Sequence, residues 1–409
     1  MILNLLNICL KKGIERLPKN KIIHLQTEMR LCNCCGGSDL ELMWSNKSII
    51  VKSSSTWEFP VNVSICRNCG FCFSSPSPNS DDLMKYYGDG NTSYKEISLP
   101  YSIEERLRIL DKYKVPDGIF VEIGGDAPGE FHRRCSKYFN QLHSIEATKD
   151  LKNKSIDINT LNESVDVISH YDVLEHVLDI KQFLLNCFSA LKRGGVMICE
   201  VPNLKLYPDN LLLQEPDHVN HFTISSLNLI AEKIGFSLID TDNNASRPHG
   251  FVAIFKKEGV DIPCKKEYKN EFIEARKYIA GALKQIHNND IYLTNLRKKM
   301  NQLTKDDKKI ILWGVTDLLR SLLKDYKLSD KAIVVDSDPR RKDDLILDGI
   351  GVSQPIKCVE NFLQADLLVI CAPRYASDIL TWIESNTGKI FKDISLSIIG
   401  VNSHGKTLR

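Results

Sequence analysis

The chain has 409 residues, of which 43% are hydrophobic and 26% charged, and its formal net charge at pH 7 is +2. This length exceeds what one hydrophobic core usually serves, so two or three domains are expected. The composition is that of a globular protein, and the small net charge argues against nucleic-acid binding by bulk electrostatics. No run approaches the ~20 apolar residues that a bilayer-spanning helix needs.

Residues 1–30 are expected to form an N-terminal helix. The stretch "MILNLLNICLKKGIERL" places its lysines after its apolar residues. That order is the reverse of a signal peptide, and no small-residue cleavage site follows. We therefore expect a short amphipathic helix that packs on the protein, with membrane contact as the less favoured alternative, and a cytoplasmic location.

Thirteen cysteines are many for a cytoplasmic protein, and their placement suggests their role. Six of them fall within residues 32–72, where two Cys-x-x-Cys pairs are each followed directly by glycine. A disulfide framework would spread through a small secreted chain, so this cluster favours a metal over buried or redox cysteines. Four thiolates suit structural Zn²⁺, in a ribbon-like domain over residues 31–90. The predicted ligands are Cys32, Cys35, Cys66 and Cys69, with Cys34 and Cys72 as alternative ligands.

Strands and helices alternate from Asp117 to about Lys257. Apolar runs such as "GIFVEIG", "VDVISHY" and "VMICEVPN" are separated by helical runs such as "IKQFLLNCFSALKRGG". Connections of this length imply right-handed crossovers and a parallel sheet. The pattern predicts an α/β fold, with a Rossmann-like domain over residues 91–258.

The first strand of this domain runs into a glycine-rich loop, "IFVEIGGDAPGEF", at residues 119–131. In a parallel α/β sheet, ligands lie beyond the carboxyl ends of the strands, and the first strand-to-helix turn must let the backbone approach the ligand. Gly124, Gly125 and Gly129 permit that approach. An acid at the end of the next strand binds a ribose in such folds, and Glu146 occupies that place. Because G-x-G-x-x-G is lacking, an adenosyl compound is favoured over a dinucleotide.

The segment at residues 163–203 resembles the central signature of class I S-adenosylmethionine-dependent methyltransferases. In that family a strand ending near "VLEH" is followed by a helix, an "LKxGG" turn and a strand ending in "VPN". The loop departs from the family at Asp126 and Pro128, where glycines are more usual, and Pro128 removes a backbone donor. The residues that match in register are Leu191, Lys192, Gly194, Gly195, Pro202 and Asn203.

The resemblance implies S-adenosylmethionine as the cofactor, and it implies roles for single residues. Glu146 would contact the ribose, and Asp157 would border the adenine. Tyr171 and Asp172, just before "VLEH", would line the sulfonium side. The residues expected to bind the cofactor are Glu122, Gly124, Gly125, Gly129, Glu146, Asp157 and Asp172, of which Glu122 and Gly124 belong to the motif that contacts the methionine portion.

A narrower resemblance is to sugar methyltransferases that carry a four-cysteine zinc domain, a central methyltransferase domain and a C-terminal Rossmann-like domain. In members that act on deoxysugar nucleotides, a Glu-His pair in an "EHxxYF" segment supplies base chemistry. The corresponding stretch here is "QEPDHVNHFT", residues 214–223. Asp217 and His218 take the places of the pair, His221 stands where tyrosine would be, and Phe222 matches.

His218 is the predicted general base. The acceptor must lose a proton when it attacks the sulfonium, and a histidine near its unperturbed pKa takes that proton at neutral pH. Asp217 would hold the tautomer of His218 or bind the substrate. His221 would take over in part if the segment is helical, and Tyr171 is the next candidate. The alternative is that the two histidines cap and pack a loop or bind a metal.

The C-terminal part contains a second α/β pattern. Residues 259–307 have helical periodicity and many charges, which predicts a helical linker made of one long helix or a helix pair. Residues 308–409 alternate strand, glycine turn and helix, which predicts a smaller Rossmann-like domain. Gly314, Asp336 and Asp338 repeat the cofactor-site pattern there. A sugar-nucleotide contact and a purely structural role are weighed evenly.

The whole sequence therefore predicts an α/β enzyme with an N-terminal zinc ribbon and two Rossmann-like domains. Its expected activity is methylation of a nucleotide-linked sugar or surface-glycan precursor, with S-adenosylmethionine and Zn²⁺ as cofactors. The expected partner is a small-molecule substrate, with no nucleic acid and no membrane span. The alternatives are a methyltransferase of a non-sugar metabolite and a binding protein that no longer holds the cofactor.

Overall fold

The structure is a computed structural model that describes residues 22–51, 56–88, 100–125, 129–145, 157–243, 249–258, 269–323, 326–338, 350–388 and 395–398. The chain divides into two compact units. The larger unit comprises residues 22–208 and 212–282. The smaller unit comprises, within the described ranges, residues 209–211 and 283–409.

The larger unit begins with short strands around the cysteine pairs. β3 and β4 form a long antiparallel hairpin, β1 adds to β4 in parallel, and β2 pairs with β6. The expected N-terminal helix is therefore wrong for residues 22–28, because strand pairing already satisfies the backbone groups of β1 and β2; residues 1–21 lie outside the described residues. The strands are β1 (Ile22–His24), β2 (Thr27–Glu28), β3 (Leu40–Val51), β4 (Thr56–Cys66), β5 (Cys72–Phe73) and β6 (Ser77–Pro78).

A six-stranded sheet forms the centre of the larger unit, in the order β12-β13-β10-β9-β7-β8. The four strands β8, β7, β9 and β10 run parallel, which confirms the parallel sheet predicted for them. β13 and β12 run antiparallel to their neighbours, and the sequence reasoning missed these two strands. The strands are β7 (Ile119–Ile123), β8 (Gln141–Ile145), β9 (Val165–Tyr171), β10 (Leu191–Pro202), β12 (Phe236–Asp242) and β13 (Gly250–Lys257).

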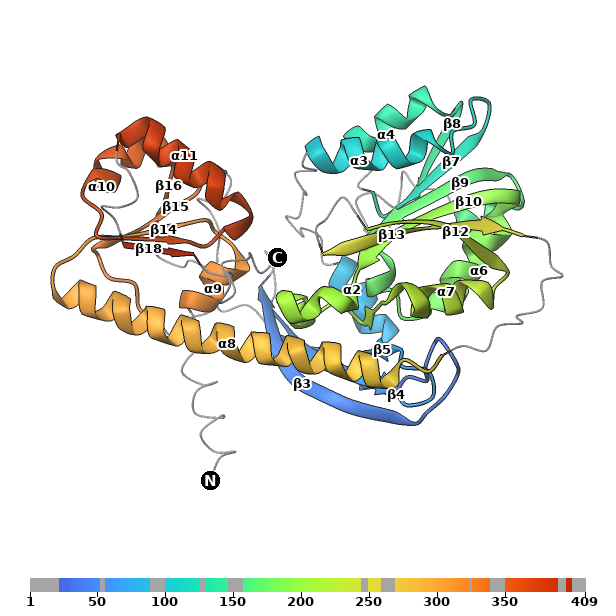
Figure 1. Cartoon of the computed structure of the whole chain (residues 1–409), viewed down its shortest axis with the longest axis horizontal. Coiled ribbons are helices and arrows are strands. Elements are labelled where there is room, and N and C mark those ends of the chain that lie inside the picture. Colours follow the sequence, from blue (N-terminus) through green and yellow to red (C-terminus); the bar gives the residue numbers. More distant parts are fainter. Residues whose placement is uncertain are drawn as a thin grey trace. The chain divides into compact units, whose positions relative to one another are not determined.

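Helices cover both faces of this sheet, α3 and α4 on one face and α6 and α7 on the other (Figure 1). Adjacent residues of β7 point to opposite faces: Phe120 packs with Phe131 of α4, whereas Val121 joins the cluster that contains Leu184 of α6. This alternation follows from the strand's two-residue period. The helices of the larger unit are α2 (Ser80–Gly88), α3 (Pro100–Asp111), α4 (Glu130–Arg134), α6 (Ile180–Ala190) and α7 (Ile224–Glu232).

The cysteine region and the central sheet share one hydrophobic core. Cys32 and Phe73 belong to the same buried cluster as Met197 of β10. The short strand β11 (Asn220–His221) pairs antiparallel with β5, and His221 stands opposite Cys72. The segment that contains the predicted base is therefore part of the sheet built by the cysteine region.

The smaller unit is a parallel five-stranded sheet in the order β16-β15-β14-β17-β18. α9 and the end of α8 pack on one face, and α10 and α11 on the other (Figure 1). The fold predicted for this part is confirmed. Its elements are β14 (Ile310–Trp313), α9 (Asp317–Leu323), β15 (Ala332–Val335), β16 (Val352–Ser353), α10 (Val359–Leu363), β17 (Leu367–Ile370), α11 (Ala376–Thr387) and β18 (Ser395–Ile398).

The linker contains one long helix, α8 (Phe272–Lys305). Its residues Leu293, Leu296 and Met300 are buried in the core of the smaller unit. Among the described residues, the short 3-10 helices are η1 (Cys135–Lys137), η2 (Ile158–Thr160), η3 (Leu174–His176), η4 (Leu204–Asp209), η5 (Leu212–Gln214), η8 (Pro355–Cys358) and η9 (Pro373–Tyr375).

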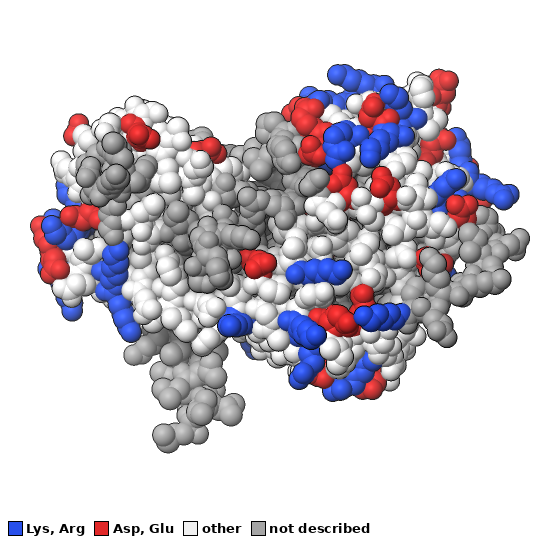
Figure 2. Space-filling model, in the orientation of Figure 1, with Lys and Arg blue, Asp and Glu red and all other residues white. Residues whose placement is uncertain are grey.

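The surface carries charges of both signs. On the face shown in Figure 2, blue basic and red acidic side chains are interspersed rather than gathered by sign. Among the described residues, the helices are too short or too polar to span a membrane.

Candidate functional site

The four predicted zinc ligands lie together. The Sγ atoms of Cys32 and Cys69 are 3.6 Å apart, those of Cys35 and Cys66 are 3.4 Å apart, and all four lie within 4.8 Å of one another. Tetrahedral Zn–S bonds of ~2.3 Å put sulfurs roughly 3.8 Å apart, so this donor set fits the ion. Within the described part of the chain the cluster has these four members, without the alternative ligands Cys34 and Cys72.

The predicted glycine turns are confirmed. Gly36 and Gly70, which follow the two pairs, have φ angles of +78° and +82°. Each donates its backbone N–H to the carbonyl of the first cysteine of its pair, at 2.7 Å for Cys32 and 2.8 Å for Cys66. Glycine is needed because side chains disfavour this left-handed conformation.

The loop after β7 closes tightly over Glu122. The carboxylate of Glu122 is 1% exposed, and its Oε2 lies 3.0 Å from Nδ1 of His132 in α4. A Cβ at Gly125 would lie 2.1 Å from this carboxyl group, so a side chain there would displace the buried Glu122 carboxylate. Gly124 has a φ of +73°, and a Cβ at this position would lie 2.7 Å from the Val173 side chain. The loop thus touches the turn that follows β9.

Of the other predicted cofactor residues, the structure describes Asp157 and Gly129. Glu146 and the atypical loop residues Asp126 and Pro128 lie outside the described residues. Asp157 is exposed and caps η2, its Oδ1 accepting from the backbone N–H of Asn159 at 3.0 Å. Gly129 precedes α4 as its N-cap residue.

Tyr171 and Asp172 end β9 on the side covered by α3 and α4. The ring of Tyr171 lies against Phe131, and the Arg106 guanidinium lies 4.1 Å from its centroid. Burial raises the pKa of Tyr171, so its phenol stays protonated at neutral pH and is suited to donate a hydrogen bond. Asp172 has a φ of +55°, and its backbone N–H donates to the Glu200 carbonyl at 2.9 Å.

His218 lies in a cluster that the sequence reasoning assigned only in part. Glu175 and His176 of η3 and His218 each bring one ligand atom within 4.8 Å of the others. The rings of His176 and His218 meet edge to face, with centroids 4.9 Å apart. We call these three side chains the acid-histidine cluster. Glu175 and His176 come from the "VLEH" stretch, where an acid and a histidine directly after a strand end were an available signal.

The predicted partner of His218, Asp217, contacts a different histidine. Nδ1 of His176 donates to the backbone carbonyl of Asp217 at 3.0 Å and lies 3.7 Å from its Oδ2. Asn220 holds η3 in place, because its amide donates to the carbonyls of Leu174 at 2.9 Å and Val177 at 2.6 Å. Asn220 is therefore a positioning residue that the sequence reasoning missed.

Burial controls the charge of the acid-histidine cluster. It raises the pKa of Glu175 well above the ordinary value, and the nearby carboxylates of Asp172 and Asp217 add to the shift. Burial also lowers the pKa of His218 well below its ordinary value, as do the neighbouring histidines. Both shifts disfavour the charged forms of these side chains.

His221 is held apart from this chemistry. It is 2% exposed, and its Nδ1 lies 3.1 Å from the hydroxyl of Tyr207. Burial lowers its pKa to about 3. The segment is not helical at this point, since His221 lies in β11, so the helical spacing on which its backup role depended is absent.

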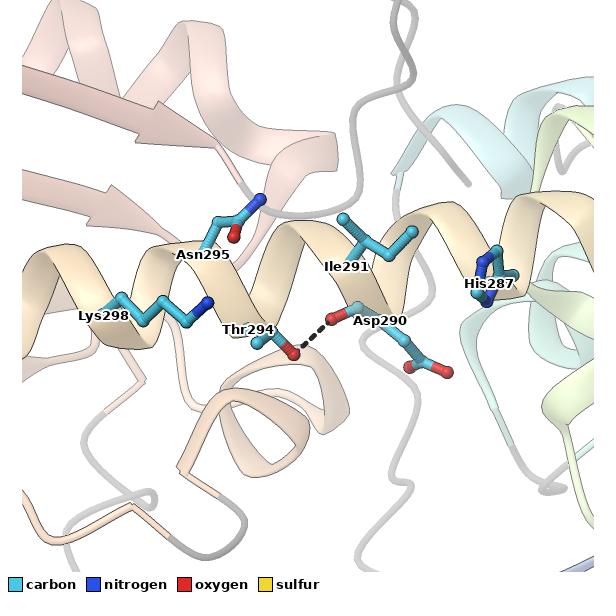
Figure 3. Close-up of a pocket in the computed structure, with 6 residues that line it drawn as sticks. All are labelled: His287, Asp290, Ile291, Thr294, Asn295 and Lys298. Atoms are coloured by element: carbon cyan, nitrogen blue, oxygen red, sulfur yellow. Dashed lines mark hydrogen bonds between the residues drawn. The ribbon is translucent and has the colours of Figure 1, made fainter.

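A separate hollow of about 330 Å³ lies along α8 in the smaller unit. Figure 3 shows its lining side chains projecting from successive turns of this one helix, with the Thr294 hydroxyl donating to the Asp290 carbonyl at 2.8 Å. The residues that line it are His287, Asp290, Ile291, Thr294, Asn295 and Lys298.

Comparison with known proteins agrees with this arrangement. A family profile described as "Methyltransferase domain" matches residues 93–241. A curated protein of Mycolicibacterium smegmatis named "Probable S-adenosylmethionine-dependent methyltransferase" is 34% identical over 79 residues, which are 19% of this chain. The match spans 31% of the length of that relative.

Solved structures of methyltransferases also align with the chain. An S-adenosylmethionine-dependent methyltransferase from Mesorhizobium loti is 12% identical, covers 38% of this chain and 97% of its own, and has a TM-score of 0.32. A 1,6-didemethyltoxoflavin-N1-methyltransferase from Burkholderia thailandensis is 10% identical, covers 52% and 100%, and has a TM-score of 0.34. Residues 93–241 therefore match a methyltransferase-domain family, and part of the chain is similar to a probable S-adenosylmethionine-dependent methyltransferase.

Proposed function

We propose that the protein transfers a methyl group from S-adenosylmethionine to a small-molecule acceptor. The observation that carries this proposal is the contact between the glycine loop and the turn before η3, where a Cβ on Gly124 would lie 2.7 Å from Val173. β7 and β9 are parallel neighbours, so their carboxyl ends share one edge of the sheet. We therefore propose that the cofactor binds at this edge, over the glycine loop, and that the acceptor binds beside the acid-histidine cluster.

Methyl transfer is a displacement at carbon. The acceptor atom forms a bond to the methyl carbon, the carbon–sulfur bond breaks, and its electron pair stays on sulfur, leaving S-adenosylhomocysteine. The acceptor also loses a proton, and we assign its activation for that loss to the acid-histidine cluster, of which His218 is a member. Glu122, Gly124, Gly125, Gly129 and Asp172 remain the proposed cofactor contacts, together with Glu146 and Asp157.

The proposed acceptor is a nucleotide-linked sugar. The support is the resemblance of residues 214–223 to the base-bearing segment of sugar methyltransferases, combined with a four-cysteine region before the methyltransferase domain and a Rossmann-like unit after it. The four-cysteine cluster is proposed to hold structural Zn²⁺, supported by its sulfur–sulfur distances. The ion would stabilise the sheet that contains β11 and takes no part in the reaction.

Incubation of the full chain with S-adenosylmethionine and a panel of nucleotide-linked sugars tests this proposal. We expect S-adenosylhomocysteine to accumulate with one of them and the labelled methyl group to appear on its sugar. Methyl transfer to a non-sugar metabolite instead would show that the proposed acceptor class, nucleotide-linked sugars, is wrong. Absence of cofactor binding would contradict the methyltransferase activity itself.

A further inference from the structure

The acid-histidine cluster has the composition of a metal site. It consists of one carboxylate and two imidazoles, contributed by Glu175, His176 and His218, with ligand atoms within 4.8 Å of one another. A set of two histidines and one carboxylate binds divalent transition-metal ions and leaves coordination positions open. Apart from the four cysteines, it is the candidate metal-binding group among the described residues.

Glu175 provides a second, independent sign of a missing ligand. It is 1% exposed, and neither of its carboxylate oxygens has a hydrogen-bond partner among the described residues. A buried carboxylate without a partner is costly, whereas a coordinated cation supplies both charge and directed bonds.

The two histidines are prepared for coordination. Nδ1 of His176 must donate its proton to the Asp217 carbonyl, because a carbonyl oxygen can only accept. The lone pair of His176 is therefore on Nε2. Most metal-binding histidines are oriented in this way, by a carbonyl or carboxylate that accepts the proton of the other ring nitrogen. Nδ1 of His218 is buried without a hydrogen-bond partner in the described part of the chain.

We propose that Glu175, His176 and His218 bind a divalent transition-metal ion, and that a hydroxyl oxygen of the methyl acceptor completes its coordination. The proposal rests on the methyl transfer proposed above. The ion would polarise the hydroxyl group, whose proton leaves to solvent while the oxygen forms its bond to the methyl carbon and sulfur keeps the electrons of the broken bond. His218 then acts as a ligand, and the ion provides the activation that the sequence had assigned to a free base.

The acceptor class follows from this coordination. Three protein ligands leave room for more than one oxygen at a metal ion of four to six coordination positions. A polyhydroxylated acceptor with neighbouring hydroxyl groups would bind through two of them, and one of these would receive the methyl group. A nucleotide-linked sugar belongs to that class.

Titration of full-length protein that contains one Zn²⁺ per chain with Mn²⁺ tests the site, with the free ion followed by its electron paramagnetic resonance signal. Mn²⁺ is a suitable probe because it prefers oxygen ligands to thiolates, so it leaves the thiolate site to Zn²⁺. We expect the parent protein to bind one Mn²⁺. Glu175→Gln, which keeps the shape of the side chain, should weaken that binding at least tenfold, and so should His176→Asn.

His24→Ala is the matched control, because His24 is a histidine with a 63% exposed side chain that contacts Glu58, far along the chain from the cluster. It should bind Mn²⁺ as the parent does. Circular dichroism and zinc content verify that each variant is folded. A parent protein that binds no Mn²⁺, or a folded Glu175→Gln variant that binds it unchanged, would overturn the proposal.

Cofactor titration of the same samples separates this inference from the proposed function. Normal S-adenosylmethionine binding without Mn²⁺ binding would contradict the proposed metal site but agree with the proposed methyltransferase activity. If Mn²⁺ binds in a way that depends on Glu175 but S-adenosylmethionine does not bind, the result would agree with the proposed metal site and contradict the proposed activity.

Discussion

The four-cysteine cluster and the acid-histidine cluster have similar dimensions but arise in different ways. In both, the ligand atoms lie within 4.8 Å of one another. Each cysteine pair is formed by one local turn that a positive-φ glycine allows. The acid-histidine cluster instead needs the turn after β9 and the segment before β11 to meet, and Asn220 joins them. Local spacing therefore reveals the first site, whereas the second depends on sheet topology.

Removal of two zinc ligands should have the largest effect. Cys66→Ser combined with Cys69→Ser should abolish stoichiometric zinc binding and unfold the strands of the cysteine region, since a structural Zn²⁺ contributes on the order of 10 kcal/mol. Methyl transfer should be lost with it, because β5 carries β11. Metal analysis of the purified variant is the measurement. Stoichiometric zinc in that double variant would contradict the ligand assignment.

His218→Ala should lower turnover by roughly a hundredfold or more, as expected for loss of the group that activates the acceptor. The dissociation constant of S-adenosylhomocysteine should stay close to that of the parent. Turnover and cofactor titration measure the two quantities. Parent-like turnover in the variant would move acceptor activation to another group.

Asn220→Ala tests the link between the two clusters. Asn220 is fully buried, and its loss removes the donor to the Val177 carbonyl and one of two donors to the Leu174 carbonyl, which should cost about 2 kcal/mol of unfolding free energy. Turnover should fall roughly tenfold because η3 is no longer held. Asn228→Ala is the control, since Asn228 bonds to Glu232 within α7. Equal effects of both substitutions would argue against a positioning role.

His170 is a buried histidine that belongs to neither cluster, so it shows what burial alone does to a histidine. Both of its ring nitrogens lack hydrogen-bond partners among the described residues, and burial lowers its pKa to about 3. Below pH 6.5 the unfolded chain binds a proton at this histidine that the folded chain does not bind. The free energy of unfolding therefore decreases as the pH is lowered. At pH 5 this contribution is about 2 kcal/mol. Urea unfolding at pH 7 and pH 5 should show a smaller loss for His170→Leu than for the parent.

Sequence reasoning succeeded where function depends on local chain geometry. The grouping of the four cysteines, their glycine turns and the parallel strands β7 to β10 follow from spacing and from the alternation of elements. It failed for residues 22–28, which lie within the range expected to form a helix but contain strands that pair with β4 and β6. Adjacency in sequence suggested that Asp217 orients His218, whereas the Asp217 carbonyl accepts from Nδ1 of His176. That Asp217 binds the substrate stays a prediction.

The measurement that tests the account most directly is isothermal titration of the full chain with S-adenosylmethionine, comparing the parent with two variants. The parent should bind one cofactor, His218→Ala should bind it equally well, and Gly125→Val should lose binding. A Cβ at Gly125 would lie 2.1 Å from the Glu122 carboxyl group, which forces the loop open. Absence of binding by the parent, or undiminished binding by Gly125→Val, would contradict the claim that this loop and the acid-histidine cluster form one methyltransferase site.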